Sequence, residues 1–188
     1  MGLDKKLEIG EMLLTEVTIQ NRVRELAWQI SHDYEGKRLL VVAVLKGAFI
    51  FVADLARHLQ VPAAFDFLAV CSYGSATASS GEVRILKDLD ESVEGWDVLL
   101  VEDIVDTGLT LNYLTQSLWA RRPASLRICS LLDKPARRQV PVKLDYCGFQ
   151  IPDKFAVGYG LDFDGRYRNA PFIFVPAECL TEGEKGCD

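Results

Sequence analysis

Three acidic residues and a threonine–glycine turn stand close together in the segment VLLVEDIVDTGLTL, at positions 98–111. The acids are Glu102, Asp103 and Asp106, and the turn Thr107-Gly108-Leu109-Thr110 follows directly. Carboxylates accept hydrogen bonds from sugar hydroxyls or hold a divalent cation. Threonine hydroxyls and the free N–H groups at the start of a helix bind phosphate. The pattern therefore indicates a ligand with both a ribose and a phosphate. The alternative is a plain strand-to-helix turn with solvated acids.

Apolar patterns on both sides of this segment predict alternating strands and helices. A 3.6-residue apolar period predicts a helix over 18–32, and a short β-branched run predicts a buried strand over 39–45. Helices are also expected over 48–60 and about 111–119, and strands over 64–70, 98–101, 126–132, 155–159 and 172–175. This alternation favours an α/β fold with a mainly parallel sheet, in which ligands bind beyond the carboxyl ends of the strands.

The composition is that of one folded domain over residues 1–188, with a long polar loop at about 72–81. The chain is 49% hydrophobic and 26% charged, which excludes disordered and collagen-like proteins. Its net charge of −6 argues against binding to nucleic acid or to an anionic membrane. The charge is uneven, with nine acids and two bases in 82–106, and seven bases and one acid in 121–143.

Cysteine usage and the apolar runs predict a cytoplasmic protein. The five cysteines are odd in number and form no CxxC pair, so we expect reduced thiols and neither a disulfide framework nor a zinc site. No signal peptide is evident at the N-terminus. The most apolar run, 39–56, is interrupted by Lys46 and Gly47, so it reads as a strand and a helix and not as a membrane span.

The acidic segment resembles the phosphoribosyl-diphosphate-binding motif of the type I phosphoribosyltransferases. Matching blocks cover most of the chain from about residue 14 to residue 175. They are VLKGAF (44–49), SYGS (72–75), SSGEVRILKDLD (79–90), VEDIVDTG (101–108), SLLDKPARR (130–138) and IPDKFAVGYGLDFDGRYR (151–168). The blocks at 130–138 and 151–168 are similar to those of bacterial hypoxanthine phosphoribosyltransferases. The resemblance implies a type I phosphoribosyltransferase fold: a mainly parallel, twisted α/β sheet flanked by helices, a small hood made by the N- and C-terminal segments, and a flexible active-site loop.

The resemblance also implies an activity, that of a Mg²⁺-dependent glycosyltransferase (pentosyltransferase) of purine salvage. It would transfer phosphoribosyl from 5-phospho-α-D-ribose 1-diphosphate to N9 of hypoxanthine, and also of guanine, giving the nucleotide IMP or GMP and diphosphate. Glu102 and Asp103 would bind the ribose hydroxyls and a metal, and Asp106 would take the proton from purine N7 as general base. The turn Thr107-Gly108-Leu109-Thr110 would bind the 5′-phosphate, Leu109 through its backbone alone. Asp162 would bind a second Mg²⁺ through water.

The remaining implied substrate contacts lie outside the central segment. Lys46-Gly47 corresponds to a pyrophosphate loop, often with a non-proline cis bond, and Arg168 would contact the pyrophosphate. Ser72 and Tyr73 begin the loop that would close over the site. The purine would be read by three further residues. Lys134 would bond its O6, Phe155 would stack on the ring, and the Ala156 backbone would contact its edge.

Plainer interpretations stay open for several of these residues. From position alone Lys134 could be an exposed lysine, and Phe155 could be a core aromatic. Arg137 and Arg138 are expected to be solvated or subunit-contact charges. Two other functions also stay open: a nucleic-acid-binding regulator built on the same fold, and a sister enzyme that prefers xanthine or guanine. Family members form dimers or tetramers, so a homodimer or homotetramer is expected.

Overall fold

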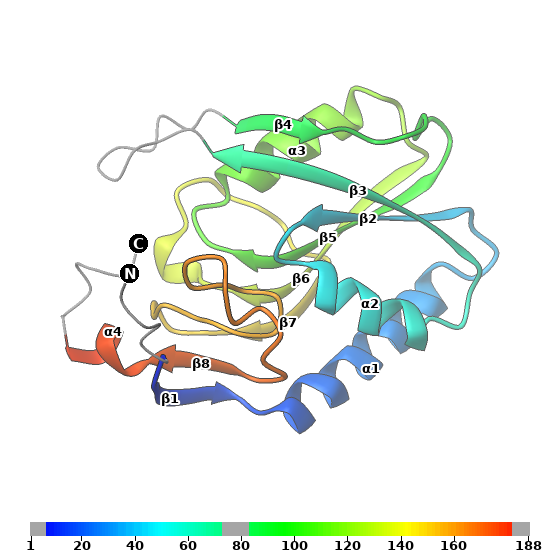
Figure 1. The fold of residues 1–188 in the computed structure, drawn as a ribbon. Helices are drawn as coiled ribbons and strands as arrows, with labels where there is room; N and C mark the ends of the chain where they lie inside the picture. Colours follow the sequence, from blue (N-terminus) through cyan, green and yellow to red (C-terminus); the bar gives the residue numbers. More distant parts are fainter. Residues whose placement is uncertain (1–6, 73–82, 182–188) are drawn as a thin grey trace.

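The computed structural model describes residues 7–72 and 83–181, and its centre is a six-stranded sheet. The strands lie in the order β4-β3-β2-β5-β6-β7 (Figure 1). Their bounds are β2 Leu39–Leu45, β3 Ala63–Ser72, β4 Val83–Lys87, β5 Asp97–Val105, β6 Ser125–Asp133 and β7 Tyr146–Gln150. All neighbours pair in parallel except β4, which runs antiparallel to β3 at one edge. The predicted α/β fold with a mainly parallel sheet is confirmed.

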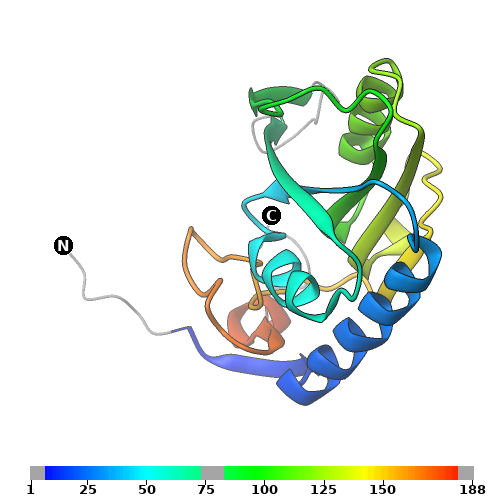
Figure 2. The same cartoon turned by 90° about the vertical axis from the view of Figure 1, so that its right-hand side faces the viewer.

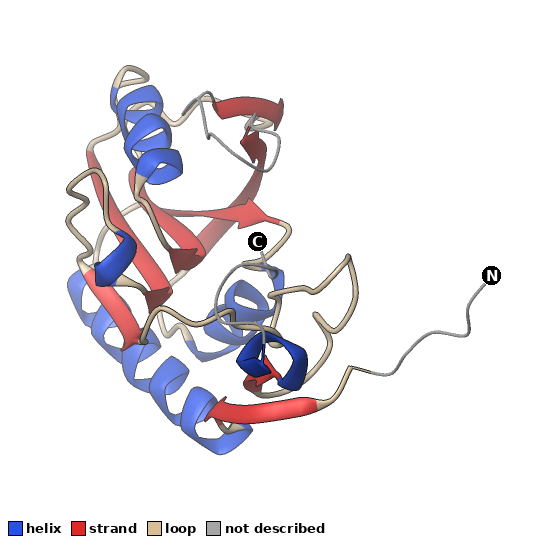
Figure 3. Ribbon diagram, turned by 90° about the vertical axis from the view of Figure 1, so that its left-hand side faces the viewer, coloured by secondary structure: helices blue, strands red, loops and turns tan. Residues whose placement is uncertain are grey.

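Helices cover both faces of this sheet (Figures 2 and 3). Helices α1 (Glu16–Asp33) and α2 (Phe49–His58) pack on one face against the side chains of Val41 and Ala43. Helix α3 (Leu109–Trp119) packs on the other face against those of Val42 and Val44. Because side chains alternate along a strand, β2 is buried on both faces, and its bounds agree with the continuous apolar run that predicted it. A short 3₁₀ helix, η1 (Pro135–Arg137), follows β6.

A second, smaller sheet lies on the β7 side of the molecule, away from β4 (Figure 1). It consists of β1 (Ile9–Leu14) paired antiparallel with β8 (Ile173–Pro176), and α4 (Ala177–Thr181) follows directly. Segments from the two ends of the chain thus lie side by side. The predicted strand over 172–175 corresponds to β8, whereas β1 is not evident from the sequence pattern.

The strand predicted over 155–159 is wrong. This segment makes two isolated bridges, Val157 with Phe174 and Gly158 with Leu161, and turns between Gly158 and Leu161. Gly158, Tyr159 and Gly160 have φ values of 104°, 50° and 102°, which an extended strand cannot accommodate. The apolar run FAVGY therefore ends in a tight turn at residues 158–160, where all three φ values are positive.

Strand β5 continues beyond the predicted end at Val101, to Val105. Glu102 and Asp103 consequently lie in the strand, with Glu102 opposite Ser130 of β6. Only Asp106 stands beyond its end. Among residues 7–72 and 83–181, no helix is long and apolar enough to cross a membrane.

Candidate active site

The half-buried side chains of Glu102 and Asp103 lie close to each other near the carboxyl end of β5. The Glu102 Oε2 atom is shielded from solvent and has no hydrogen-bond partner. Burial, followed by the charge of Asp103, raises the pKa of Glu102 well above its usual range. Burial also raises the pKa of Asp103, although bonds from Glu102 and from the Ile104 N–H, which lies 2.8 Å from Asp103 Oδ1, act against it. Two close carboxylates with an unsatisfied oxygen favour a shared proton or a cation.

The loop between β2 and α2 lies against Asp103. A Cβ atom placed on Gly47 would fall 1.5 Å from Asp103 Oδ2, so only glycine fits there. The peptide bond Leu45–Lys46 is cis. The non-proline cis bond implied for this loop is therefore present, one bond before Lys46–Gly47. Lys46 itself is exposed.

A turn after β5 leads into the N-terminus of α3. Asp106 and Thr107 precede Gly108, whose φ of 85° makes it a left-handed N-cap, and α3 begins at Leu109. The Thr107 hydroxyl accepts a hydrogen bond from Leu109 N at 3.4 Å. The Thr107 carbonyl accepts from Gln139 N at 2.9 Å and from Val140 N at 3.1 Å. The turn thus presents the N–H groups at the start of a helix, and it is held in place by the hydrogen bonds from Gln139 and Val140.

Basic residues after β6 lie next to Asp106. Lys134 is only 5% exposed, and its backbone N–H donates to the Val105 carbonyl at 2.9 Å. Its ammonium lies 3.9 Å from Asp153 Oδ1. Arg137 Nε lies 3.4 Å from Asp106 Oδ1 and 3.9 Å from Asp153 Oδ1. Lys134 is therefore a buried lysine close to the predicted base, and not an exposed one.

The expectation of a solvated charge is wrong for Arg138, which forms a largely buried ion pair with Asp133. Arg137 is exposed, as expected of a solvated charge, but it also lies near the carboxylates of Asp106 and Asp153 at the end of the sheet. Sequence reasoning missed Arg137 because its partners are distant in the sequence. The useful indication was the parallel pairing of β5 with β6, which places the residues after both strands at one edge of the sheet.

The 151–168 segment supplies the other predicted residues. Phe155 is half-buried and packs edge-on against Phe163, with 5.9 Å between ring centroids, and Ala156 is buried. Arg168 pairs with Asp162 at 2.5 Å and donates to the Gly160 carbonyl at 2.6 Å. A Cβ atom on Gly160 would lie 2.0 Å from the Gly47 carbonyl oxygen, so this segment touches the 46–47 loop.

The structure thus brings together residues from four separate parts of the sequence. Gly47, Asp103 and Gly160 meet at one point, and Arg168 lies close enough for its charge to lower the pKa of Asp103. Arg137 lies near both Asp106 and Asp153, and Lys134 lies near Asp153. Ser72 is the last residue of β3, while Tyr73 and almost all of the predicted 72–81 loop lie outside the described residues.

The donor set suits a magnesium ion that is held jointly with substrate. In the described part of the chain, no group of three or more His, Cys, Asp or Glu side chains could hold a metal. Mg²⁺, however, is usually bound by one or two carboxylates together with water and substrate phosphates. Glu102 and Asp103, with one buried oxygen lacking a partner, fit that pattern.

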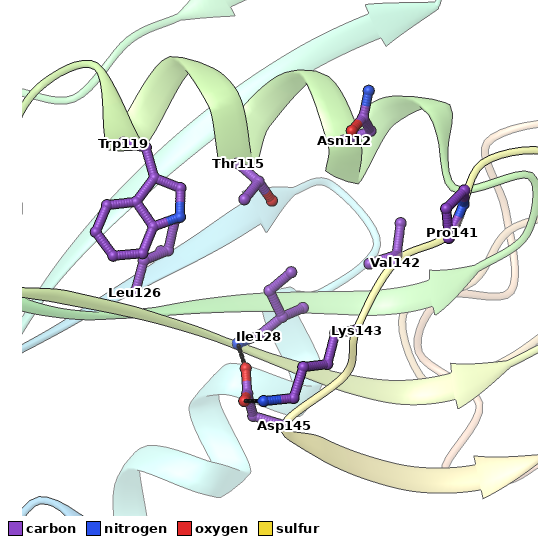
Figure 4. Close-up of a pocket in the computed structure, with 9 residues that line it drawn as sticks. All are labelled: Asn112, Thr115, Trp119, Leu126, Ile128, Pro141, Val142, Lys143 and Asp145. Atoms are coloured by element: carbon purple, nitrogen blue, oxygen red, sulfur yellow. Dashed lines mark hydrogen bonds and ion pairs between the residues drawn. The ribbon is translucent and has the colours of Figure 1, made fainter.

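A separate cavity of about 230 Å³ lies behind the turn at 107–108, between α3, β6 and the 141–145 segment (Figure 4). Thr115 and Trp119 line it from the helix, and Val142 and Lys143 line it from the opposite side. Lys143 and Asp145 form an ion pair at its edge, with 3.4 Å between Nζ and Oδ1. Val142 is also close to Gly108, since a Cβ atom on Gly108 would lie 3.0 Å from Val142 Cγ2.

Comparison with known proteins identifies the family. A model of the phosphoribosyl transferase domain matches residues 11–164. The chain belongs to the phosphoribosyltransferase family. The predicted family and fold are therefore confirmed.

Individual phosphoribosyltransferases agree with this chain over nearly its whole length. It is similar to the hypoxanthine-guanine phosphoribosyltransferase of Mycobacterium bovis, with 54% identity over 172 residues, covering 88% of this chain and 85% of the relative. It is also similar to the enzyme of that name from Bacillus subtilis, with 49% identity over 177 residues, covering 94% and 98%. A crystal structure of a hypoxanthine phosphoribosyltransferase from Staphylococcus aureus superposes with a TM-score of 0.88 at 46% identity, covering 92% and 94%.

Proposed function

We propose that this chain is a Mg²⁺-dependent hypoxanthine phosphoribosyltransferase of purine salvage, which also accepts guanine. One observation carries the proposal. The half-buried carboxylates of Glu102 and Asp103 in β5 are followed by Asp106 and by a glycine-capped helix N-terminus. Arg137 lies 3.4 Å from Asp106, and the buried Lys134 lies 3.9 Å from the neighbouring Asp153. The relatives named hypoxanthine-guanine phosphoribosyltransferase support the same activity.

In this proposal separate groups of residues bind the ribose, the 5′-phosphate and the diphosphate of the phosphoribosyl substrate. Glu102 and Asp103 bind the ribose hydroxyls, and the backbone N–H groups of 107–110 bind the 5′-phosphate. Lys46, Gly47 and Arg168 receive the diphosphate, and Asp162 meets the second metal through water. The metal ions, when bound, neutralise and orient the leaving diphosphate.

Asp106 carries the proton transfer. It takes the proton from N7 as N9 of the purine forms a bond to C1′ and the bond from C1′ to diphosphate breaks, so configuration at C1′ inverts. The Asp106 Oδ1 atom accepts no hydrogen bond, and Arg137 Nε lies 3.4 Å from it. The 72–81 loop, beginning at Ser72 and Tyr73, would exclude water from the reacting sugar.

Lys134 selects the base. Its buried ammonium has donors only, so it can bond a purine O6 but finds no acceptor on the amino group of adenine. Phe155 stacks on the ring, and the Ala156 backbone contacts its edge. A site built to hydrogen-bond one substituent of its substrate has a much lower kcat/KM for an analogue that lacks this substituent. Adenine, which has no O6, should therefore be a poor substrate.

Competition among purines tests this base preference. Equal amounts of hypoxanthine, guanine, xanthine and adenine are offered with 5-phospho-α-D-ribose 1-diphosphate and Mg²⁺, and the nucleotides formed are quantified. We expect IMP and GMP to predominate and no AMP from adenine. Lys134→Met should lower kcat/KM for hypoxanthine by about 10²-fold or more, whereas Lys143→Met, at an exposed lysine, should not. A preference for xanthine would instead identify the sister enzyme.

We infer further that the chain works as one domain in the cytoplasm, with β1, β8 and the 151–172 segment as its hood, and that it forms a homodimer or homotetramer. Large apolar side chains that are exposed in the single chain, among them Phe49 and Phe65, support assembly. A related structure from Trypanosoma cruzi, with a TM-score of 0.87 and 44% identity, was described for the role of its C-terminal region in oligomeric state and activity. Light scattering on the purified chain tests this point, and a monomer at micromolar concentration would contradict it.

A further inference from the structure

A buried hydrogen bond joins helix α2 to the left-handed turn at 158–160. The Tyr159 phenol, on a side chain only 2% exposed, donates to Asp54 Oδ2 at 2.6 Å. Asp54 is 6% exposed and also accepts from Gln20 Nε2 at 2.6 Å and from Arg57. In Figure 2 part of the 151–172 segment passes beside α2, and the Tyr159–Asp54 bond joins the two. None of the roles assigned above uses either residue.

Both ends of this bond lead directly to the diphosphate site. On one side, Asp54 lies in the helix that begins two residues after Gly47, so α2 fixes the end of the 46–47 loop. On the other side, Tyr159 is followed by Gly160, whose N–H donates to the Arg168 carbonyl at 2.8 Å. The Gly160 carbonyl in turn accepts from the Arg168 guanidinium at 2.6 Å.

The two sides also touch each other at the site. Gly160 packs so closely on the Gly47 carbonyl that no Cβ atom would fit between them, and Gly47 packs equally closely on the Asp103 carboxylate. A change in the distance between α2 and the 158–160 turn would therefore move Gly47 and Arg168 relative to each other. Tightly packed segments of this kind transmit small shifts with little loss.

We propose that Tyr159 and Asp54 are positioning residues, which together set the spacing between the 46–47 loop and Arg168 and thereby the affinity for the diphosphate group. The proposal rests on the proposed function, because it concerns the same substrate. It predicts a selective effect: the pair influences the diphosphate end of the site and leaves the purine end, at Lys134 and Phe155, unaffected.

The protonation states suit such a bond across a wide pH range. Burial, followed by the neighbouring Asp54 carboxylate, raises the pKa of the Tyr159 phenol, so it stays a donor. Burial acts to raise the pKa of Asp54, but the bonds from Tyr159, Gln20 and Arg57 together outweigh it and hold that pKa below its ordinary value. A neutral donor thus meets a charged acceptor, which is a strong combination in a buried place.

The test is the Tyr159→Phe variant, which removes one hydroxyl and keeps the ring. We expect KM for 5-phospho-α-D-ribose 1-diphosphate to rise about tenfold, in keeping with loss of a bond to a charged group, and KM for hypoxanthine to change less than twofold. Calorimetric titration with inorganic diphosphate and Mg²⁺ should show the same tenfold loss of affinity. That measurement does not depend on turnover, so it remains decisive even if the wild type forms no IMP and the proposed function fails.

Tyr146→Phe is the matched control. Tyr146 is likewise buried, and its phenol lies 2.7 Å from the Asp33 carboxylate, but that bond joins α1 to β7, away from the diphosphate loop. We expect Tyr146→Phe to lower stability while leaving both KM values and diphosphate affinity unchanged.

Asp54→Asn gives a second test if Tyr159→Phe fails to fold. The double variant should weaken diphosphate binding no more than the stronger single variant, because both substitutions remove the same bond. Equal effects on both substrates, or unchanged diphosphate affinity in Tyr159→Phe, would overturn the proposal.

Discussion

Asp106 and Arg137 face each other beyond the open ends of β5 and β6, at an Oδ1–Nε distance of 3.4 Å. The pair leaves the Asp106 Oδ1 atom without a hydrogen bond although it is shielded from solvent. The same arginine lies 3.9 Å from Asp153, so its charge is shared between two acids.

Replacing Asp106 by alanine tests the assignment of the base. Because positioned general-base catalysis contributes about 10²–10⁴ in rate, we expect kcat to fall by a factor in that range while diphosphate affinity changes little. Steady-state kinetics with hypoxanthine provides the measurement. Asp164→Ala is the control, since Asp164 is exposed and pairs only locally with Arg166. Turnover of Asp106→Ala close to wild type would remove Asp106 from this role.

At the scale of elements, the turn at 106–110 depends on the segment that supports it from behind. The backbone N–H groups of Gln139 and Val140 both donate to the Thr107 carbonyl. Gly108 has no room for a side chain, because a Cβ atom placed on it would lie 2.6 Å from the Val140 carbonyl oxygen. The N-terminus of α3 is therefore fixed before any ligand arrives. Such preorganisation lowers the cost of binding an anion.

Gly108→Ala should disturb this turn more than an equivalent change elsewhere. Gly95 also has a positive φ, of 76°, but nothing lies within 4 Å of its would-be Cβ atom. Gly95→Ala should lower the free energy of unfolding by only about 1–2 kcal/mol, the cost of a left-handed backbone conformation for a residue with a Cβ atom. Gly108→Ala should lower the free energy of unfolding, measured in urea, by more than Gly95→Ala does. It should also raise KM for 5-phospho-α-D-ribose 1-diphosphate. Equal costs for the two variants, with unchanged KM, would contradict this account of the turn.

The end of α1 is tied to β6 and β7 by a group that responds to acid. A hydrogen bond from Tyr146, foremost, and pairing with Arg127 hold the pKa of Asp33 below its ordinary value of 3.8, against the effect of burial. A carboxyl whose pKa is lowered by folding stabilises the fold fully above its unfolded pKa. That contribution is lost as the pH falls through the folded pKa.

The stability difference between wild type and Asp33→Asn should therefore depend on pH. We expect it to be constant near neutrality and to shrink as the pH falls below about 4, because wild-type Asp33 then becomes protonated as well. Urea unfolding from neutral pH into the acid range measures it. Glu35→Gln, at an exposed neighbour, serves as control. A difference that stays constant into acid would show that Asp33 does not carry this linkage.

The elements differ in how far the sequence could predict them. The strand at 39–45 was predicted with its exact bounds because both of its faces are buried and the run is uninterrupted. Strands β1, β4 and β7 were missed, since short, partly exposed strands carry little periodic pattern and β1 finds its partner at the other end of the chain. The site acids were predictable because they are contiguous. The contacts of Arg137, and of Tyr159 with Asp54, exist only through tertiary packing.

Across the whole molecule, the acidic and basic blocks of the sequence meet as ion pairs. Arg121 pairs with Asp88 at 2.7 Å, Arg122 with Glu94 at 3.2 Å, and Arg137 with Asp106. These basic residues therefore have acidic partners and do not form a continuous basic surface, which counts against a nucleic-acid-binding regulator. Individually such exposed pairs contribute little to stability.

The most direct test of the central claim is product formation by the purified chain. With hypoxanthine, 5-phospho-α-D-ribose 1-diphosphate and Mg²⁺, the chain should form IMP and diphosphate in equal amounts, and removal of Mg²⁺ with a chelator should stop the reaction. Chromatographic quantification of both products provides the measurement. Absence of IMP under these conditions, with a folded protein and intact substrates, would contradict the account.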